Sequence, residues 1–321
     1  MKKILAVASL IGVLTISGCS KVVTQEAFIE GLVEYNTNLS SYYSNVTLEI
    51  IKQEDVINFE VEVYYLAEDY YKVIMKDLQT NNTQAIVKND DGVTVLTPLL
   101  NKQFKFSSDW PLNSSHAYLY QSLVKDITND ETASVIHDDT NFVVTSAFNS
   151  KTNAALKTQK VTLTNDYKPL YCVVLNEAQE TQIKATYNDF VDNYSLKTSD
   201  FDTNAVTTSL RLEMGEGVFN TVIEDVVPTY TPDNTDVSTS STDDYVMYNY
   251  SGDYNYTITC QKVEEDAVLS PSVTYDDFVL LSSGIAAYKN NSITFYQGDV
   301  QVTIFSNTLD IEMLVSIADS F

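Results

Sequence analysis

The sequence predicts a mainly β fold of the α+β class, a curved antiparallel half-barrel with helices covering its concave face, followed by a small C-terminal α+β domain. Three observations predict it: about eleven strand-like segments follow one another between residues 44 and 191, their links are short and polar, and two amphipathic helical segments accompany them. So long a meander curls, and its apolar concave face then needs a cover, which the two helices can supply.

The chain begins with the pattern of a bacterial lipoprotein signal peptide over residues 1–18. Lys2 and Lys3 precede an apolar run, residues 4–16, and Ser17-Gly18-Cys19 matches a lipobox. The run is too short to span a bilayer comfortably as a helix. We therefore predict that Cys19 becomes the mature N-terminus and carries a diacylglyceryl anchor, which places the protein on the outer, extracytoplasmic face of the cell membrane.

A tether over residues 19–24 leads into the first helix, expected over residues 25–39. Phe28, Leu32 and Tyr35 recur every three to four residues and form one apolar face. A first series of antiparallel strands follows, and in its second member the alternation of apolar and acidic residues predicts one buried and one solvated face. The series comprises residues 44–51, 56–66, 70–78, 83–89, 92–97 and 103–107.

The next segment joins a hairpin to a second helix. Asp91-Gly92 supplies the positive φ of a tight turn, and Phe104 and Phe106 point to the same side of the strand that follows. Trp110, the only tryptophan, is interpreted as a core anchor, with a place in a ligand pocket as the alternative. The helix is expected over residues 114–128, with Asn113 or Ser114 as its cap and apolar positions Tyr118, Leu119, Leu123 and Ile127 at helical spacing.

Five further strands complete the half-barrel domain, which we place at residues 25–213. Its last part, residues 195–213, shows no regular apolar spacing and is expected to leave the sheet. Residues 214–244 then read as a connecting segment and a linker with few apolar side chains. The five strands are expected over residues 134–137, 141–148, 157–164, 169–176 and 181–191.

The C-terminal domain is placed at residues 245–321. A final helix is expected over residues 308–320, where Leu309, Met313, Leu314 and Ile317 form one face. The strands before it are expected over residues 254–260, 279–281, 285–289, 292–297 and 300–306.

Charge and composition exclude several functions. Acidic residues outnumber basic ones 44 to 19, which argues against nucleic-acid partners and against electrostatic binding to anionic lipid headgroups. His116 and His137 have no partner at metal-binding spacing, and no catalytic motif is present, so we predict no enzyme, no cofactor and no metal. Cys172 and Cys260 could pair in an exported protein or remain as buried thiols, and the sequence leaves this open.

The run V-L-T-P-L-L-N-K-Q-F-K-F-S-S-D-W-P at residues 95–111, with N-S-S and L-Y-Q-S-L-V after it, resembles the LolA-like lipoproteins of Gram-positive bacteria. These relatives of the outer-membrane lipoprotein carrier include sporulation and germination lipoproteins, and the resemblance spans about residues 25–204. It implies a half-barrel with helices across its mouth and an apolar cavity between. The C-terminal domain more weakly resembles modules of lipoproteins and anti-sigma proteins.

Two functions follow as hypotheses. In the first, the cavity binds an acyl chain, a lipid or the lipid of another lipoprotein, and is lined or bounded by Phe104, Phe106, Trp110, Leu119 and Leu123. In the second, the half-barrel is a docking scaffold for an envelope protein, as in sporulation or germination members or RseB-like regulators. An open apolar cavity favours the first hypothesis, and a well-packed interior favours the second.

Overall fold

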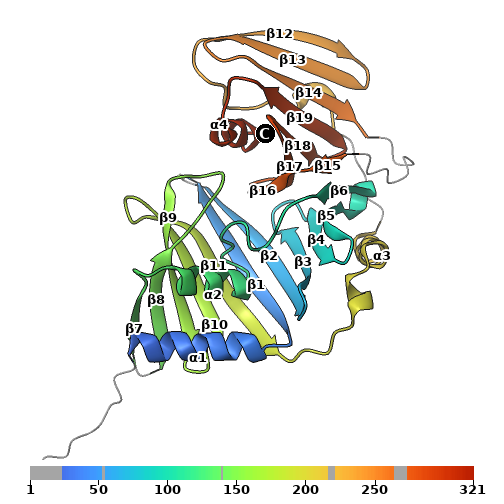
Figure 1. The fold of residues 1–321 in the computed structure, drawn as a ribbon. Coiled ribbons are helices and arrows are strands. Elements are labelled where there is room, and N and C mark those ends of the chain that lie inside the picture. Colours follow the sequence, from blue (N-terminus) through green and yellow to red (C-terminus); the bar gives the residue numbers. More distant parts are fainter. Residues whose placement is uncertain (1–23, 53–54, 139, 216–220, 264–272) are drawn as a thin grey trace, which may run out of the picture.

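The computed structural model describes residues 24–52, 55–138, 140–215, 221–263 and 273–321. Its larger sheet has the order β15-β6-β5-β4-β3-β2-β1-β11-β10-β9-β8-β7 and is antiparallel except where β15 joins β6 (Figure 1). The strands are β1 (Ser41–Lys52), β2 (Asp55–Leu66), β3 (Tyr70–Asp77), β4 (Thr83–Asn89), β5 (Gly92–Thr97), β6 (Lys102–Phe106), β7 (Ser134–His137), β8 (Asn141–Ala147), β9 (Leu156–Thr164), β10 (Pro169–Asn176), β11 (Thr181–Asp192) and β15 (Thr274–Tyr275).

The sheet is curved and open, as the sequence predicts. Pairing of β1 with β11 joins the two strand series side by side, while β7 stays at one edge and does not meet β6. Phe59, Val61 and Val63 of β2 are buried on one side of the sheet, as the alternation indicates. The mainly β, half-barrel fold class is therefore confirmed.

Two helices cover the concave face (Figure 1). The first, α1 (Gln25–Asn38), begins at Thr24, whose side chain accepts a hydrogen bond from the Ala27 amide, and it buries Phe28 and Leu32. The second, α2 (Tyr120–Asn129), buries Leu123 and Ile127 in the same core. Together they bring the apolar face of the sheet out of water.

The start of α2 corrects the sequence prediction. The helix begins at Tyr120, six residues later than expected, because the serines and asparagine before it make other contacts. The Ser115 amide donates to the Asn149 carbonyl at 3.0 Å, and the Asn113 side chain donates to Asp277 at 2.8 Å. Leu119 occupies the N-cap position without a side-chain hydrogen bond.

A third helix packs on the convex face, where the sequence predicted only irregular chain. This helix, α3 (Thr203–Met214), follows the short turn η2 (Thr198–Phe201) and is capped by Asp202, which accepts from the Ala205 amide at 2.8 Å. Val206 and Leu210, one turn apart, are buried against the sheet. The convex face is therefore only partly solvated.

The C-terminal unit (residues 221–321) forms a second antiparallel sheet of order β12-β13-β14-β19-β18-β17-β16. Leu314 and Ile317 of its helix are buried against that sheet. Asp310 caps the helix by accepting from the Met313 amide, so the helix is shorter than predicted. The elements are β13 (Tyr245–Gly252), β14 (Tyr256–Lys262), β16 (Asp277–Leu281), β17 (Gly284–Lys289), β18 (Ser292–Gln297), β19 (Val300–Ser306), α4 (Ile311–Ala318) and the turns η1 (Pro98–Leu100) of the half-barrel and η3 (Ile223–Asp225).

Strand β12 (Thr235–Thr242) corrects the predicted linker. It pairs with β13 in register Thr242↔Tyr245 and forms the edge of the second sheet. Most of its side chains are exposed on both faces, so the apolar alternation that marks a half-buried strand is missing.

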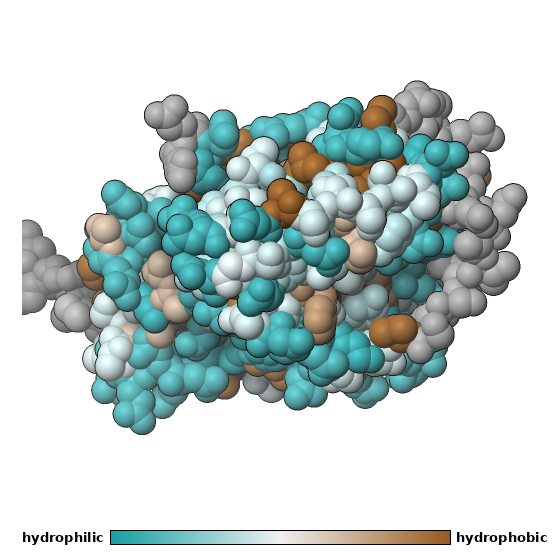
Figure 2. Space-filling view, turned by 90° about the horizontal axis from the view of Figure 1, so that it is seen from above, coloured by the Kyte–Doolittle hydropathy of each residue, from teal (hydrophilic) through white to brown (hydrophobic). Residues whose placement is uncertain are grey.

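Figure 2, viewed from the side of the C-terminal unit, shows a largely hydrophilic face with hydrophobic residues in small groups.

Within the described residues, none of the helices combines the length and the apolarity needed to cross a bilayer.

Candidate functional site

The five residues predicted to line or bound a lipid cavity lie in one packed core. Each is at most 6% exposed, and all belong to the cluster that joins the concave face to α1 and α2. The five are Phe104, Phe106, Trp110, Leu119 and Leu123. The structure therefore brings them together, and a direct ligand contact stays a prediction.

Aromatic side chains occupy the centre of this core. The Tyr42 ring stacks on Phe190 with centroids 4.9 Å apart and meets Tyr120 edge to face at 6.4 Å. Phe28 of α1 packs on Phe142 at 4.8 Å. These rings are large apolar groups that pack against one another, so side chains fill this part of the concave interior, where the family resemblance implies an apolar cavity.

Three of the five residues also contact the C-terminal unit. Phe104 stacks on Tyr296 with centroids 5.4 Å apart, and Phe106 meets Phe278 edge to face at 5.3 Å. The ring centroids of Trp110 and Phe278 are 6.0 Å apart. The C-terminal unit therefore closes one end of the half-barrel with its own aromatic side chains.

Backbone pairing continues this closure. β15 adds to the edge of β6 in parallel, with Thr274 opposite Lys105, and the Ser107 amide donates to the Tyr275 carbonyl at 2.9 Å. The edge strand β6 is thereby covered, which removes a surface open to strand pairing.

Asp277 anchors this contact through side chains of the half-barrel. Its carboxylate accepts hydrogen bonds from Ser108 Oγ at 3.0 Å, Asn113 Nδ2 at 2.8 Å and Lys151 Nζ at 2.7 Å. The Asp277 side chain is 18% exposed, so these charge-assisted bonds are partly shielded from water.

Other polar contacts also join the units away from Asp277. Gln84 Oε1 accepts from the Ile285 amide at 2.6 Å, and Lys52 of β1 forms an ion pair with Asp319. The two units are thus joined by apolar, backbone and charged contacts together.

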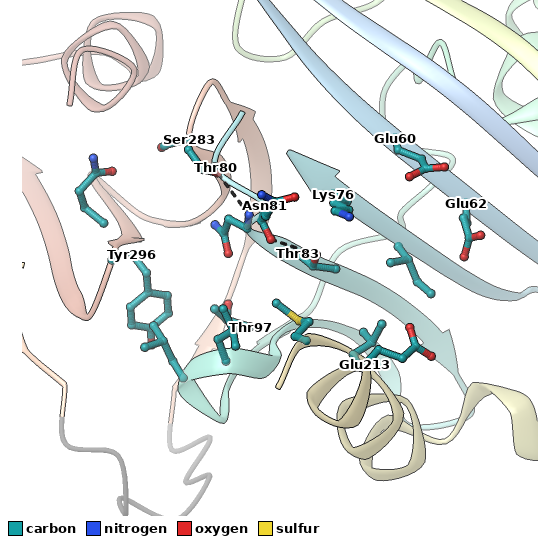
Figure 3. A pocket seen from close by; sticks show the side chains of 18 residues that line it. Glu60, Glu62, Lys76, Thr80, Asn81, Thr83, Thr97, Glu213, Ser283 and Tyr296 are labelled. Atoms are coloured by element: carbon teal, nitrogen blue, oxygen red, sulfur yellow. Dashed lines mark hydrogen bonds between the residues drawn. The ribbon is translucent and has the colours of Figure 1, made fainter. Parts of the chain in front are cut away.

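A pocket of about 750 Å³ lies on the opposite, convex side, between α3, the β3–β4 turn and the C-terminal unit. Its apolar lining comes from Ile74, Leu99, Leu100, Leu210, Met214 and the Tyr296 ring. Figure 3 shows Glu60 and Glu62 on β2, with Glu213 on α3 on the other side of the same end of the pocket, and Ser283 and Tyr296 at the opposite end.

The acidic end of the pocket is held by hydrogen bonds. Glu62 accepts from the hydroxyls of Tyr43 at 3.2 Å and Tyr64 at 3.1 Å, and Glu60 accepts from Asn45 Nδ2 at 3.1 Å. Burial and the neighbouring Glu62 carboxylate raise the pKa of Tyr64, so its hydroxyl stays a donor at neutral pH.

Sequence reasoning missed this pocket for two reasons. The alternation in β2 predicted that Glu60 and Glu62 lie on the face of the strand away from the core, which they do. It did not show that α3 lies beside this face and forms a pocket with it. Leu210 and Met214 are one turn apart on α3 and could have indicated a helix face. Tyr296 reaches the pocket only through the tertiary fold.

Cys172 and Cys260 are buried free thiols in different sheets, and burial raises the pKa of Cys260 to about 11. Burial lowers the pKa of His116 to about 4. Among the described residues, no group of three or more metal-ligating side chains is close enough to hold an ion. Cys19 lies outside the described residues.

The fold and site define a class of protein: a half-barrel packed with its own side chains, closed by a second β unit and carrying a pocket on its convex side. The chain belongs to the YdcC-like sporulation protein family, whose family model matches residues 1–201. This membership confirms the resemblance to sporulation proteins inferred from residues 95–124.

Known proteins similar to the chain include the sporulation protein YdcC of Bacillus subtilis strain 168, which is 28% identical over 326 residues, covering 99% of this chain and 96% of the relative. Among solved structures, a LolA superfamily protein of Nitrosomonas europaea matches at 12% identity and a TM-score of 0.33, over 57% of this chain and 99% of that one. The MucA/MucB complex of Pseudomonas aeruginosa matches at 11% identity and a TM-score of 0.32, over 90% of this chain and 97% of that one. At these TM-scores the structural likeness supports no inference about function.

Proposed function

We propose that this protein is a non-catalytic lipoprotein that acts in sporulation as a docking scaffold for an envelope protein. Membership of the sporulation family supports the process. The lipobox at Cys19 supports a diacylglyceryl anchor on the outer face of the cell membrane. The anchor keeps the scaffold near membrane-bound partners, and the large acidic excess of the chain opposes any second, electrostatic attachment to anionic lipid.

One observation carries the scaffold proposal: the concave interior is packed, and the C-terminal unit closes its end. An acyl chain gains about 0.8 kcal/mol for each methylene it buries. To enter, however, it must displace side chains such as Tyr42 and Tyr120, whose burial contributes about 1.5–3 kcal/mol each. Each displaced side chain therefore offsets the burial of about two to four methylenes, so this packing favours docking over lipid carriage.

The contacts between the two units also suit a scaffold. The two units are joined by the aromatic contacts of Phe104, Phe106 and Trp110, and by the hydrogen bonds of Asp277. A surface that spans both units, such as the convex side, is therefore presented to a partner in one fixed arrangement. Preorganisation of this kind lowers the entropic cost of association.

Native mass spectrometry of the chain from Ser20 onward tests the choice between scaffold and carrier. We expect the mass of the polypeptide alone, both after purification from a bacterial host and after incubation with phospholipid or lipopeptide. A stoichiometric acyl or lipid mass that stays bound would contradict the scaffold proposal and favour the carrier hypothesis.

Docking itself is tested by photo-crosslinking in sporulating cells. A crosslinking residue at Glu213 on α3 is compared with one at Glu30 on α1, both on exposed helix surfaces. We expect a discrete adduct with an envelope protein from the Glu213 position only. Equal adducts from both positions would indicate random collision and count against a specific docking face.

A further inference from the structure

We propose that the pocket on the convex side binds a segment of the partner protein that carries basic side chains next to apolar ones. This inference rests on the proposed scaffold function and names the chemistry that the scaffold recognises. Three features of the pocket carry it: its size and apolar wall, its three carboxylates, and its position between the two units.

The size and wall of the pocket fit peptide side chains. Its volume of about 750 Å³ falls within the range of about 300–1,000 Å³ that small ligand sites occupy. Leu100 and Leu210 are buried beneath it, while Leu99, Met214 and the Tyr296 ring are partly exposed to it. An apolar side chain placed there would leave water for a preformed apolar surface.

The carboxylates give the pocket its preference for positive charge. Glu60, Glu62 and Glu213 line it, and Lys76 is the only basic residue of the lining. None of the three carboxylates forms an ion pair within 4 Å among the described residues. Because Tyr43, Tyr64 and Asn45 hold Glu60 and Glu62 in place, these acceptors are oriented before a cation arrives.

The spacing of the carboxylates selects an extended ligand over a metal ion. Glu60 and Glu62 stand two residues apart on β2, and Glu213 lies across the pocket on α3 (Figure 3). They do not form a cluster that could hold an ion. Separate lysine or arginine side chains of one peptide can reach them, with apolar side chains between directed to the wall.

The pocket is built from both units, since Ser283, Tyr296, Gln297 and Gly298 come from the C-terminal unit and the remaining lining from the half-barrel. A bound peptide would therefore contact both and add to the contacts that already join them. Ligands that bind only the folded state raise its stability, so binding should raise the melting temperature of the whole chain.

Fluorescence anisotropy with three labelled peptides tests the proposal on the chain from Ser20 onward. One peptide alternates lysine and leucine, one glutamate and leucine, and one lysine and serine. We expect the lysine–leucine peptide to bind at least tenfold more tightly than either of the others, since it alone satisfies both the carboxylates and the apolar wall.

Matched variants separate the pocket from the general negative charge of the chain. Glu60→Gln, Glu62→Gln and Glu213→Gln together should weaken binding about tenfold, while each neutral amide keeps one acceptor oxygen and nearly the same shape. The control replaces three exposed carboxylates distant in sequence, by Glu30→Gln, Glu34→Gln and Glu131→Gln, and should leave binding unchanged. Met214→Trp, which fills the pocket without changing charge, should also weaken it.

Equal losses in the triple variant and its control would overturn the proposal, because the attraction would then be general. Equal binding of the lysine–serine peptide would overturn it too, since a polyamine-like cation would then suffice. Failure of all three peptides, with crosslinking from Glu213 still intact, would remove the basic-peptide inference and leave the scaffold function. Retained lipid in the mass spectrum would instead remove the scaffold function whatever the peptides do.

Discussion

The ring of Phe106 in the half-barrel meets the ring of Phe278 in the C-terminal unit edge to face, with centroids 5.3 Å apart. Phe106 is 6% exposed, and Trp110 also packs on Phe278, with ring centroids 6.0 Å apart. A phenylalanine from the second unit therefore packs directly on two of the residues predicted to line or bound a ligand cavity. This contact links the stability of the two units and leads to the first prediction.

Replacing Phe278 by alanine should lower the free energy of unfolding by about 2 kcal/mol, because the substitution removes a ring that packs on Phe106 and Trp110. Urea unfolding followed by tryptophan fluorescence measures the loss, since Trp110 is the only tryptophan. Phe305→Ala on β19 is the control: that ring is 46% exposed, and its loss should change stability by less than about 0.5 kcal/mol. Equal losses in the two variants would contradict the role given to Phe278.

Asp277→Ala should destabilise the chain by about 1–3 kcal/mol, because Ser108, Asn113 and Lys151 would each lose an acceptor at a partly buried position. The companion variant Lys151→Ala removes one exposed partner of the same carboxylate, so it should cost no more than about 1 kcal/mol. Chemical denaturation of both variants measures the difference. If Lys151→Ala cost as much as Asp277→Ala, the ion pair alone would account for the contact.

Local patterns in the sequence predict the half-barrel well and its surroundings poorly. The alternation of Phe59, Val61 and Val63 with Glu60 and Glu62 is a local signal, and the structure confirms the strand and its faces. By contrast, β12 lacks apolar alternation because it is an exposed edge strand.

The candidate site depends on distant parts of the chain. The aromatic character of Phe104 is visible in the sequence, but its neighbour Tyr296 lies nearly two hundred residues later in the chain and no spacing rule connects them. Tyr296 also lines the pocket with Glu213, from a third part of the chain. Pairings of this kind are set by tertiary packing, so the sequence shows which residues are aromatic but not which surface they build together.

Stability should fall as the pH drops from about 6.5 toward 4, and His116 should account for part of that fall. Burial lowers the pKa of its imidazole to about 4, below the ordinary value of 6.5 that applies in the unfolded chain. Between these values the unfolded state binds a proton that the folded state does not, so the His116 contribution is present above pH 6.5 and is lost on acidification by about 1.4 kcal/mol per pH unit.

Comparison with the variant His116→Gln isolates this contribution, because the carboxylates that titrate in the same pH range are present in both the original chain and the variant. The difference in unfolding free energy between the two chains should change steadily from pH 6.5 to 4 and be constant above pH 7. A difference that stays flat across the whole range would mean that the pKa of His116 is the same in the folded and the unfolded chain, contrary to its burial.

Cys172 and Cys260 should resist thiol reagents in the folded chain and react once it unfolds. Both side chains are 0% exposed, and each thiol is turned toward a buried acceptor, Gln159 Oε1 for Cys172 and the Val226 carbonyl for Cys260. Burial raises the pKa of both thiols, so the reactive thiolate is scarce at neutral pH.

Labelling of the chain from Ser20 onward with a chromogenic disulfide reagent should therefore give no fast-reacting thiol in buffer and two in denaturant. A Ser238→Cys variant on the exposed strand β12 serves as the reactive control. If only the control thiol reacted after unfolding without reductant, Cys172 and Cys260 would be paired, and the free thiols of the structure would be wrong.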